Sequence, residues 1–160
     1  MADFKALPDH SRVWVYQADR FFTEAEEAII EKQLDYFIHG WTAHSKQLVA
    51  TGLIAFRKFL ILMVDEKSEA ASGCSIDSSV RMIQDLEVKL ACSFFDRLNF
   101  VYETPTGELK SIHKDDLAAA YQKQEITDET LFFDNLITTK ADLQEKWRVP
   151  LKDSWHKQFI

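Results

Sequence analysis

The chain has 160 residues, of which 46% are hydrophobic and 12% aromatic, enough to exclude a disordered chain and to form one domain with its own core. Its net charge is −7, and the lysines and arginines are scattered along the sequence. A protein that binds the phosphate backbone of nucleic acids needs the opposite balance, so we expect no nucleic-acid partner.

The two cysteines, Cys74 and Cys92, lie at opposite ends of one predicted helix. A disulfide requires Cα atoms within about 7 Å of each other, so we expect both to be reduced thiols. The first residues lack the apolar stretch of a signal peptide, and the longest apolar run, residues 59–64, is too short to cross a bilayer. These observations indicate a cytoplasmic protein that does not contact membranes.

The first half of the chain alternates strand and helix patterns. Residues 13–17 are β-branched and aromatic, which favours a strand. Thr23 and Glu26 form a capping box that begins a helix of about four turns, ending near residues 39–40. The apolar runs 47–56 and 59–65 then predict an antiparallel hairpin.

A second amphipathic helix is predicted from Ile76, because apolar residues recur at every third or fourth position as far as Phe94. A second hairpin follows, with strands at 98–103 and 108–113 on either side of a Pro-Thr-Gly turn.

The last third of the chain is less regular. Residues 114–124 predict a short helix, and 131–137 fit either a strand or a buried turn. Another helix is expected to begin at Thr139 and to run to about Trp147. The tail carries aromatic residues, so we expect it to dock onto the rest of the protein.

The order of elements through residue 103 predicts an α+β fold. Strand, helix, strand, strand, helix, strand is the order of the ferredoxin-like, split βαβ arrangement, an antiparallel sheet with both helices on one face. We therefore expect one domain over residues 1–160, with a core at 13–103 and an extension at 104–160. The extension would add a hairpin strand and C-terminal helices to that core.

In a split βαβ unit, two connections meet at the same end of the sheet: the one after the first helix and the one before the second. Their side chains include a thiol, an imidazole and two carboxylates, which predicts one candidate pocket there. Its residues are Trp41, His44, Asp65, Cys74, Ser75 and Asp77.

Each of these residues also has a simpler structural interpretation. A helix N-terminus lowers the pKa of a thiol such as Cys74, and His44 would assist it, yet free cysteines are often small residues of a tight turn. Ser75 and Asp77 are natural N-caps of the second helix. Asp65 ends a hydrophobic strand, where a solvated carboxylate needs no further role.

Several specific chemistries are excluded by spacing. A phosphate-binding loop of the tyrosine phosphatase kind needs a cysteine, five further residues and then an arginine. Counted from Cys74, that arginine position is occupied by Val80. Four glycines, well separated, cannot form a nucleotide-binding loop. No spacing supports a metal site, and we expect no metal or cofactor. Isolated histidines, His156 among them, are interpreted as surface residues, and strand aromatics such as Trp14 and Tyr16 as core or interface packing.

Five stretches together carry a resemblance to a known family: residues 13–17, 41–44, 64–66, 72–79 and 149–155. They resemble a small family of bacterial proteins that have no assigned activity and often bear the name "ABC transporter ATPase". The resemblance covers most of the chain. It implies no ATPase residues, because this sequence has neither a Walker A loop nor the signature loop that an ABC ATPase requires.

Two hypotheses of function follow from the sequence. The first is a non-enzymatic cytoplasmic domain that packs against a second copy of itself or against another protein, as its aromatic content favours. The alternative is a protein that binds a small molecule or anion at the start of the second helix, where Cys74 faces His44. One form of this alternative is a thiol-dependent enzyme.

Overall fold

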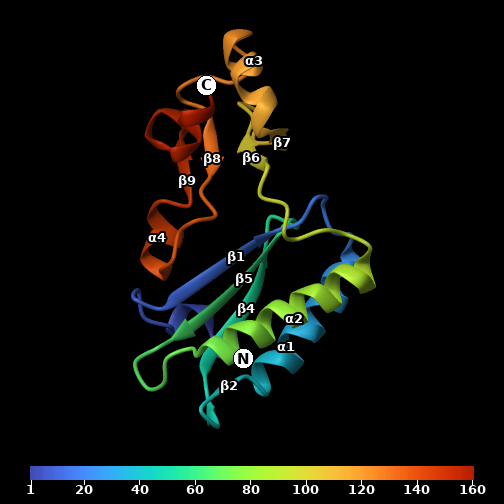
Figure 1. Ribbon diagram of the computed structural model, residues 1–160, viewed down its shortest axis with the longest axis vertical. Helices are drawn as coiled ribbons and strands as arrows, with labels where there is room; N and C mark the ends of the chain where they lie inside the picture. The colour runs from blue at the N-terminus through green and yellow to red at the C-terminus, as the bar shows by residue number, and fades with distance from the viewer.

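The computed structural model describes all residues from Met1 to Ile160, and its first half is built on a three-stranded antiparallel sheet (Figure 1). The order of strands is β1–β5–β4, so β5 is central. Their bounds are Arg12–Gln17 for β1, Val49–Ala55 for β4 and Phe59–Asp65 for β5. The predicted hairpin at 47–65 is confirmed as β4 and β5.

Strand β5 is buried along six consecutive residues because both of its faces are covered. Leu60, Leu62 and Val64 pack on the side of the helices. Phe59 and the other odd-numbered residues pack on the opposite side, against the C-terminal part of the chain. This double burial explains why the strand is apolar throughout, whereas a strand with one solvated face alternates.

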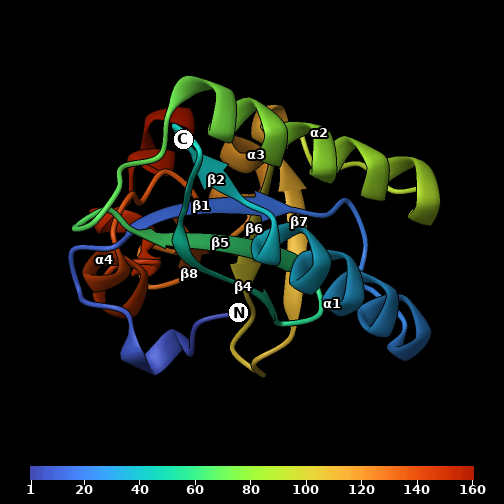
Figure 2. The ribbon, with the colours of Figure 1, turned by 90° about the horizontal axis from the view of Figure 1, so that it is seen from below.

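Helices α1 (Glu24–His39) and α2 (Gly73–Leu90) cover one face of this sheet (Figures 1 and 2). The capping box of Thr23 and Glu26 begins α1 as predicted. Gly52 of β4 lets α1 lie close to the sheet, since a Cβ atom there would stand 3.0 Å from Ile38 Cδ1.

The prediction that Ser75 or Asp77 caps α2 is wrong, because the helix begins earlier. Ser72 has extended backbone and is the N-cap, and its Oγ accepts a hydrogen bond from Ser75 N–H at 3.2 Å. Ser75 is buried in the first turn, where its hydroxyl donates to Ser72 O at 2.8 Å.

A second antiparallel sheet forms from the rest of the chain, in the order β7–β6–β8–β9. The predicted second hairpin is confirmed within it. The bounds are Asn99–Glu103 for β6, Leu109–His113 for β7, Leu131–Phe133 for β8 and Arg148–Pro150 for β9. Figure 1 shows this sheet above the first one.

The mixed α and β class with antiparallel sheets is confirmed, but the expected place of β6 in the first sheet is wrong. A ferredoxin-like sheet would place β6 beside β1, whereas it pairs with β7 and β8. The β1 edge is occupied at its ends by other segments: Arg12 forms a bridge with Thr139, and Asp19 N–H donates to Ser93 O at 3.0 Å. β6 therefore obtains its hydrogen bonds elsewhere.

The remaining elements are short. The pair β2 and β3 forms a small hairpin after α1. Helix α3 packs against the second sheet, whereas α4, which starts at Thr139 as predicted, packs against the first. Four 3-10 helices complete the fold. The bounds of all these short elements are Phe4–Ala6 for η1, Thr42–Ala43 for β2, Lys46–Gln47 for β3, Lys114–Asp116 for η2, Leu117–Gln122 for α3, Lys140–Glu145 for α4, Leu151–Asp153 for η3 and Trp155–Phe159 for η4.

The C-terminal part forms the second cover of the first sheet as well as a core of its own. Phe133, Leu143 and Trp147 pack with the outer face of β5 in one cluster. The tail docks as expected, since Trp155 and Phe159 pack against the core of the second sheet. None of the helices combines the length and hydropathy that a membrane crossing needs.

The end of α2 offers a direct test of the backbone geometry. Ala91, the exposed C-cap, has φ 49° and ψ 48°, a left-handed conformation that costs a residue with a Cβ about 1 kcal/mol. We expect Ala91→Gly to raise the free energy of unfolding by about 1 kcal/mol, measured by urea denaturation. The matched control, Ala28→Gly at an exposed position inside α1, should lower it by about 1 kcal/mol; loss of stability in both variants would contradict the assignment.

Candidate functional site

The two connections that form the predicted pocket do meet at one end of the first sheet. Trp41 Nε1–H donates to Ser75 O at 2.8 Å, and Lys46 Nζ lies 3.3 Å from a Glu69 carboxylate oxygen. Trp41 is only 2% exposed, and its ring packs against those of Trp14 and Phe37. Its part in this juxtaposition is structural, because it holds the start of α2 against the end of α1.

The other predicted site residues lie at the surface around this contact. His44, Cys74 and Asp77 are exposed. Asp65 is half-buried and accepts hydrogen bonds from Lys67 N–H at 3.0 Å and from His10, whose Nε2 lies 3.3 Å away. No group of three His, Cys, Asp or Glu side chains could hold a metal ion.

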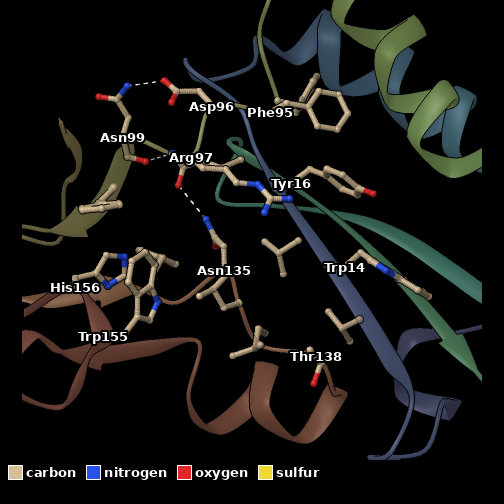
Figure 3. A pocket seen from close by; sticks show the side chains of 18 of the residues that line it. Trp14, Tyr16, Phe95, Asp96, Arg97, Asn99, Asn135, Thr138, Trp155 and His156 are labelled. Atoms are coloured by element: carbon tan, nitrogen blue, oxygen red, sulfur yellow. Dashed lines mark hydrogen bonds between the residues drawn. The ribbon is translucent and has the colours of Figure 1, made fainter. Parts of the chain in front are cut away.

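A cavity lined mostly by hydrophobic residues lies elsewhere, between the two sheets (Figure 3). It has a volume of about 360 Å³ and runs along the outer edge of β1. Residues 94–100, which lead from α2 into β6, form one wall, and residues 133–138 form another. Trp155 and His156 close its far end. We call this cavity the β1 cleft.

A chain of amide hydrogen bonds crosses the β1 cleft and joins the two sheets (Figure 3). Asn135 Nδ2 donates to Gln17 Oε1 at 3.0 Å, and Gln17 Nε2 donates to Asn99 O at 3.0 Å. Trp147 Nε1–H in turn donates to Asn135 Oδ1 at 3.0 Å. These amides are engaged with one another, so they fix the shape of the cleft.

Arg97 supplies a free positive charge at the cleft. Its side chain is exposed and makes no hydrogen bond or ion pair, and Figure 3 shows the guanidinium extending toward Tyr16. Burial raises the pKa of Tyr16, while a hydrogen bond with Ser79 and the positive charge of Arg97 oppose that rise.

The neighbouring carboxylate, Asp96, is turned toward the backbone instead of toward Arg97. It accepts hydrogen bonds from Leu98 N–H at 2.8 Å and from Asn99 Nδ2 at 2.6 Å. These two donors lower the pKa of Asp96 and hold it ionised. The guanidinium of Arg97 is therefore available to a ligand.

His156, expected at the surface, is buried at the end of the cleft with 2% of its area exposed. Its ring stacks on Trp155 with centroids 4.0 Å apart, and its Nδ1 lies 2.5 Å from Ser154 Oγ. Burial lowers the pKa of His156 to about 4, against the opposing charge of Asp134. The ring is thus neutral at neutral pH, which suits packing among aromatic rings.

The polar residues of the β1 cleft were not singled out from the sequence. Gln17, Arg97, Asn135 and His156 come from four distant segments and form no local motif. The only sequence signal near the cleft was the alternation of Trp14 and Tyr16 in β1. Their prediction as packing residues is confirmed, since both pack against the core beneath the helices.

Comparisons with protein-family models, with curated proteins and with solved structures found no match for this chain. The geometry of the cleft therefore carries the functional argument.

The burial of His156 predicts a specific dependence of stability on pH. The unfolded chain binds the proton near pH 6.5 and the folded chain only near pH 4, so stability is complete above pH 6.5 and is lost as the pH falls toward 4. Between pH 7 and 4.5, urea denaturation should show a loss about 2–3 kcal/mol larger in the wild type than in His156→Phe. Equal losses in the two proteins would contradict a neutral, buried His156.

The two cysteines should differ strongly in reactivity. Cys92 is buried, which raises its pKa to about 11, whereas Cys74 is exposed. With iodoacetamide at pH 8 we expect Cys74 to react at least about a hundredfold faster. Mass spectrometry of Cys74→Ser and Cys92→Ser, each of which keeps one thiol, measures the two rates separately. Similar rates would show that the end of α2 opens readily in solution.

Proposed function

We propose that this protein is a non-enzymatic binding domain of the cytoplasm whose ligand occupies the β1 cleft and places an anionic group on Arg97. The observation that carries the proposal is an unpaired guanidinium at a largely apolar cavity of an acidic protein. A volume of about 360 Å³ lies in the range of ligand-binding pockets.

The groups that line the cleft are suited to binding. An arginine offers a planar set of N–H donors that matches a carboxylate or a phosphate. The imidazole of His156 is a weak base at a pKa of about 4, and its Nδ1 is already engaged with Ser154. The amides of Gln17 and Asn135 hold each other in place.

The apolar part of the lining indicates that the ligand also has an apolar part. Leu136 lines the cleft and remains 60% exposed, although a large apolar side chain gains free energy by burial. Tyr16 and Phe95 pack edge to face on the opposite side, with ring centroids 5.8 Å apart. A ligand that combines a carboxylate with apolar groups would bury Leu136 and pair Arg97 at once.

Phenylacetate is a small probe with both features, and phenylacetamide is its neutral counterpart. In a titration followed by ¹H–¹⁵N NMR, phenylacetate should shift the resonances of Gln17, Arg97, Asn135 and the Trp155 indole. Arg97→Gln should weaken this binding at least about tenfold, since a hydrogen bond between charged groups contributes about 1.5–3 kcal/mol.

The matched control is Arg81→Gln, which removes an exposed arginine from α2, away from the cleft. It should bind phenylacetate as the wild type does, and phenylacetamide should bind the wild type as weakly as phenylacetate binds Arg97→Gln. Absence of shifts at the cleft, or equal binding by Arg97→Gln and the wild type, would overturn the proposal.

A further inference from the structure

The pairing of β1 with β5 fixes which backbone groups of β1 face the cleft. In an antiparallel pair, alternate residues direct both their N–H and C=O groups at the neighbouring strand. The register extends to Ala18, whose N–H donates to Lys58 O at 2.8 Å, so Ala18 and every second residue before it bond to β5. The backbone groups of Val13, Val15 and Gln17 therefore point away from β5.

Other segments of the chain close this outer edge of β1 at both ends. Val13 N–H donates to Thr138 O at 2.9 Å near the start of the strand. Beyond its other end, Asp19 N–H donates to Ser93 O at 3.0 Å. Both contacts come from the walls of the β1 cleft or from residues next to them.

Between these two contacts the edge is open. The C=O of Val13, both backbone groups of Val15 and the N–H of Gln17 have no hydrogen-bond partner in the protein. Four residue steps separate Val13 from Gln17, a distance of about 13 Å along a strand. Proteins normally cover or blunt an exposed strand edge, yet here the open stretch lines a cavity.

We infer that the β1 cleft takes the C-terminal end of an extended peptide, which adds to the edge of β1 between Val13 and Gln17 and places its terminal carboxylate on Arg97. This inference rests on the function proposed above and names the class of its ligand. Strand addition satisfies the open backbone groups, and the apolar lining accepts alternate side chains of the peptide.

Two observations favour a chain end over an internal segment. Because the edge is closed on both sides by Thr138 and Ser93, a strand that ran through the cleft would meet one of them. Arg97 extends toward Tyr16, near one end of the open stretch, where a terminal carboxylate would lie (Figure 3).

Amide hydrogen exchange measures strand addition directly. Without ligand, the N–H groups of Val15 and Gln17 should exchange rapidly, whereas those of Trp14 and Tyr16, which bond to β5, should be protected. A mixture of acetylated tetrapeptides, Gly-Xaa-Thr-Xaa with Val, Leu or Phe at Xaa and a free C-terminal carboxylate, should slow exchange of Val15 and Gln17 at least about tenfold.

Two further peptide sets locate the carboxylate. The same peptides with amidated C-termini lack the charge, and amidated Gly-Xaa-Glu-Xaa peptides carry it on an internal side chain. We expect neither set to protect Val15 at the concentration at which the free acids do. Equal protection by the internal glutamate peptides would overturn the assignment to a chain end.

A proline at position 15 tests the pairing itself. The Val15 N–H has no partner within the protein, and proline is tolerated at an edge strand when its missing N–H would face outward. Val15→Pro should lose peptide binding at least about tenfold, while Val15→Thr, which keeps the N–H, should retain it. Thermal unfolding of both variants verifies that the sheet is intact.

The phenylacetate titration separates this inference from the proposed function. If Val15→Pro still binds phenylacetate but no peptide, both stand. If the wild type binds phenylacetate at the cleft while the free-acid peptides leave Val15 and Gln17 unprotected, strand addition is wrong and the cleft binds small carboxylates. If neither probe binds there, both proposals fall.

Discussion

Burial of β5 on both of its faces is the constraint on which the rest of the structure depends. Six consecutive apolar residues of this strand, from Phe59 to Val64, are fully buried. Burying one large apolar side chain contributes about 1.5–3 kcal/mol, so neither face can be left to solvent. Helices α1 and α2 cover only one of them. The C-terminal part of the chain is therefore a required second cover.

This second cover explains the cleft. Residues 133–147 pack on the outer face of β5 and bring the β1 edge into contact with residues 138–140. β6, displaced from that edge, builds the second sheet with β7 and β8. Between the two sheets a stretch of β1 remains unpaired, and the hydrogen bonds of Gln17 and Asn135 hold the walls of the cavity at a fixed separation.

The electrostatics of the cleft follow from how its polar groups are engaged. The Asp96 carboxylate accepts hydrogen bonds within the turn that leads into β6. The side-chain amides of Gln17 and Asn135 are hydrogen-bonded to each other. His156 is neutral because burial penalises its charged form. Arg97 is left as an unpaired cation in a chain with a net charge of −7. A local positive charge of this kind attracts anions even when the protein as a whole is acidic.

The sequence alone determined the local elements. The capping box at Thr23, the N-cap at Thr139, the apolar periodicity of α1 and α2 and the two hairpins each depend on residues a few positions apart, and the structure agrees with them. It also placed Trp41 beside the start of α2, because the connections of β1, β4 and β5 with their helices leave few arrangements.

Only the tertiary structure decided which sheet β6 joins, which serine caps α2, and where the cavity lies. These outcomes depend on competition among segments far apart in sequence: residues 138–140 against β6 for the edge of β1, and aromatic rings against solvent for His156. The periodicity of apolar residues predicts which face of a helix or strand is buried. It carries no information about which distant segment pairs with the edge of a strand. The β1 cleft exists because that edge is filled only in part.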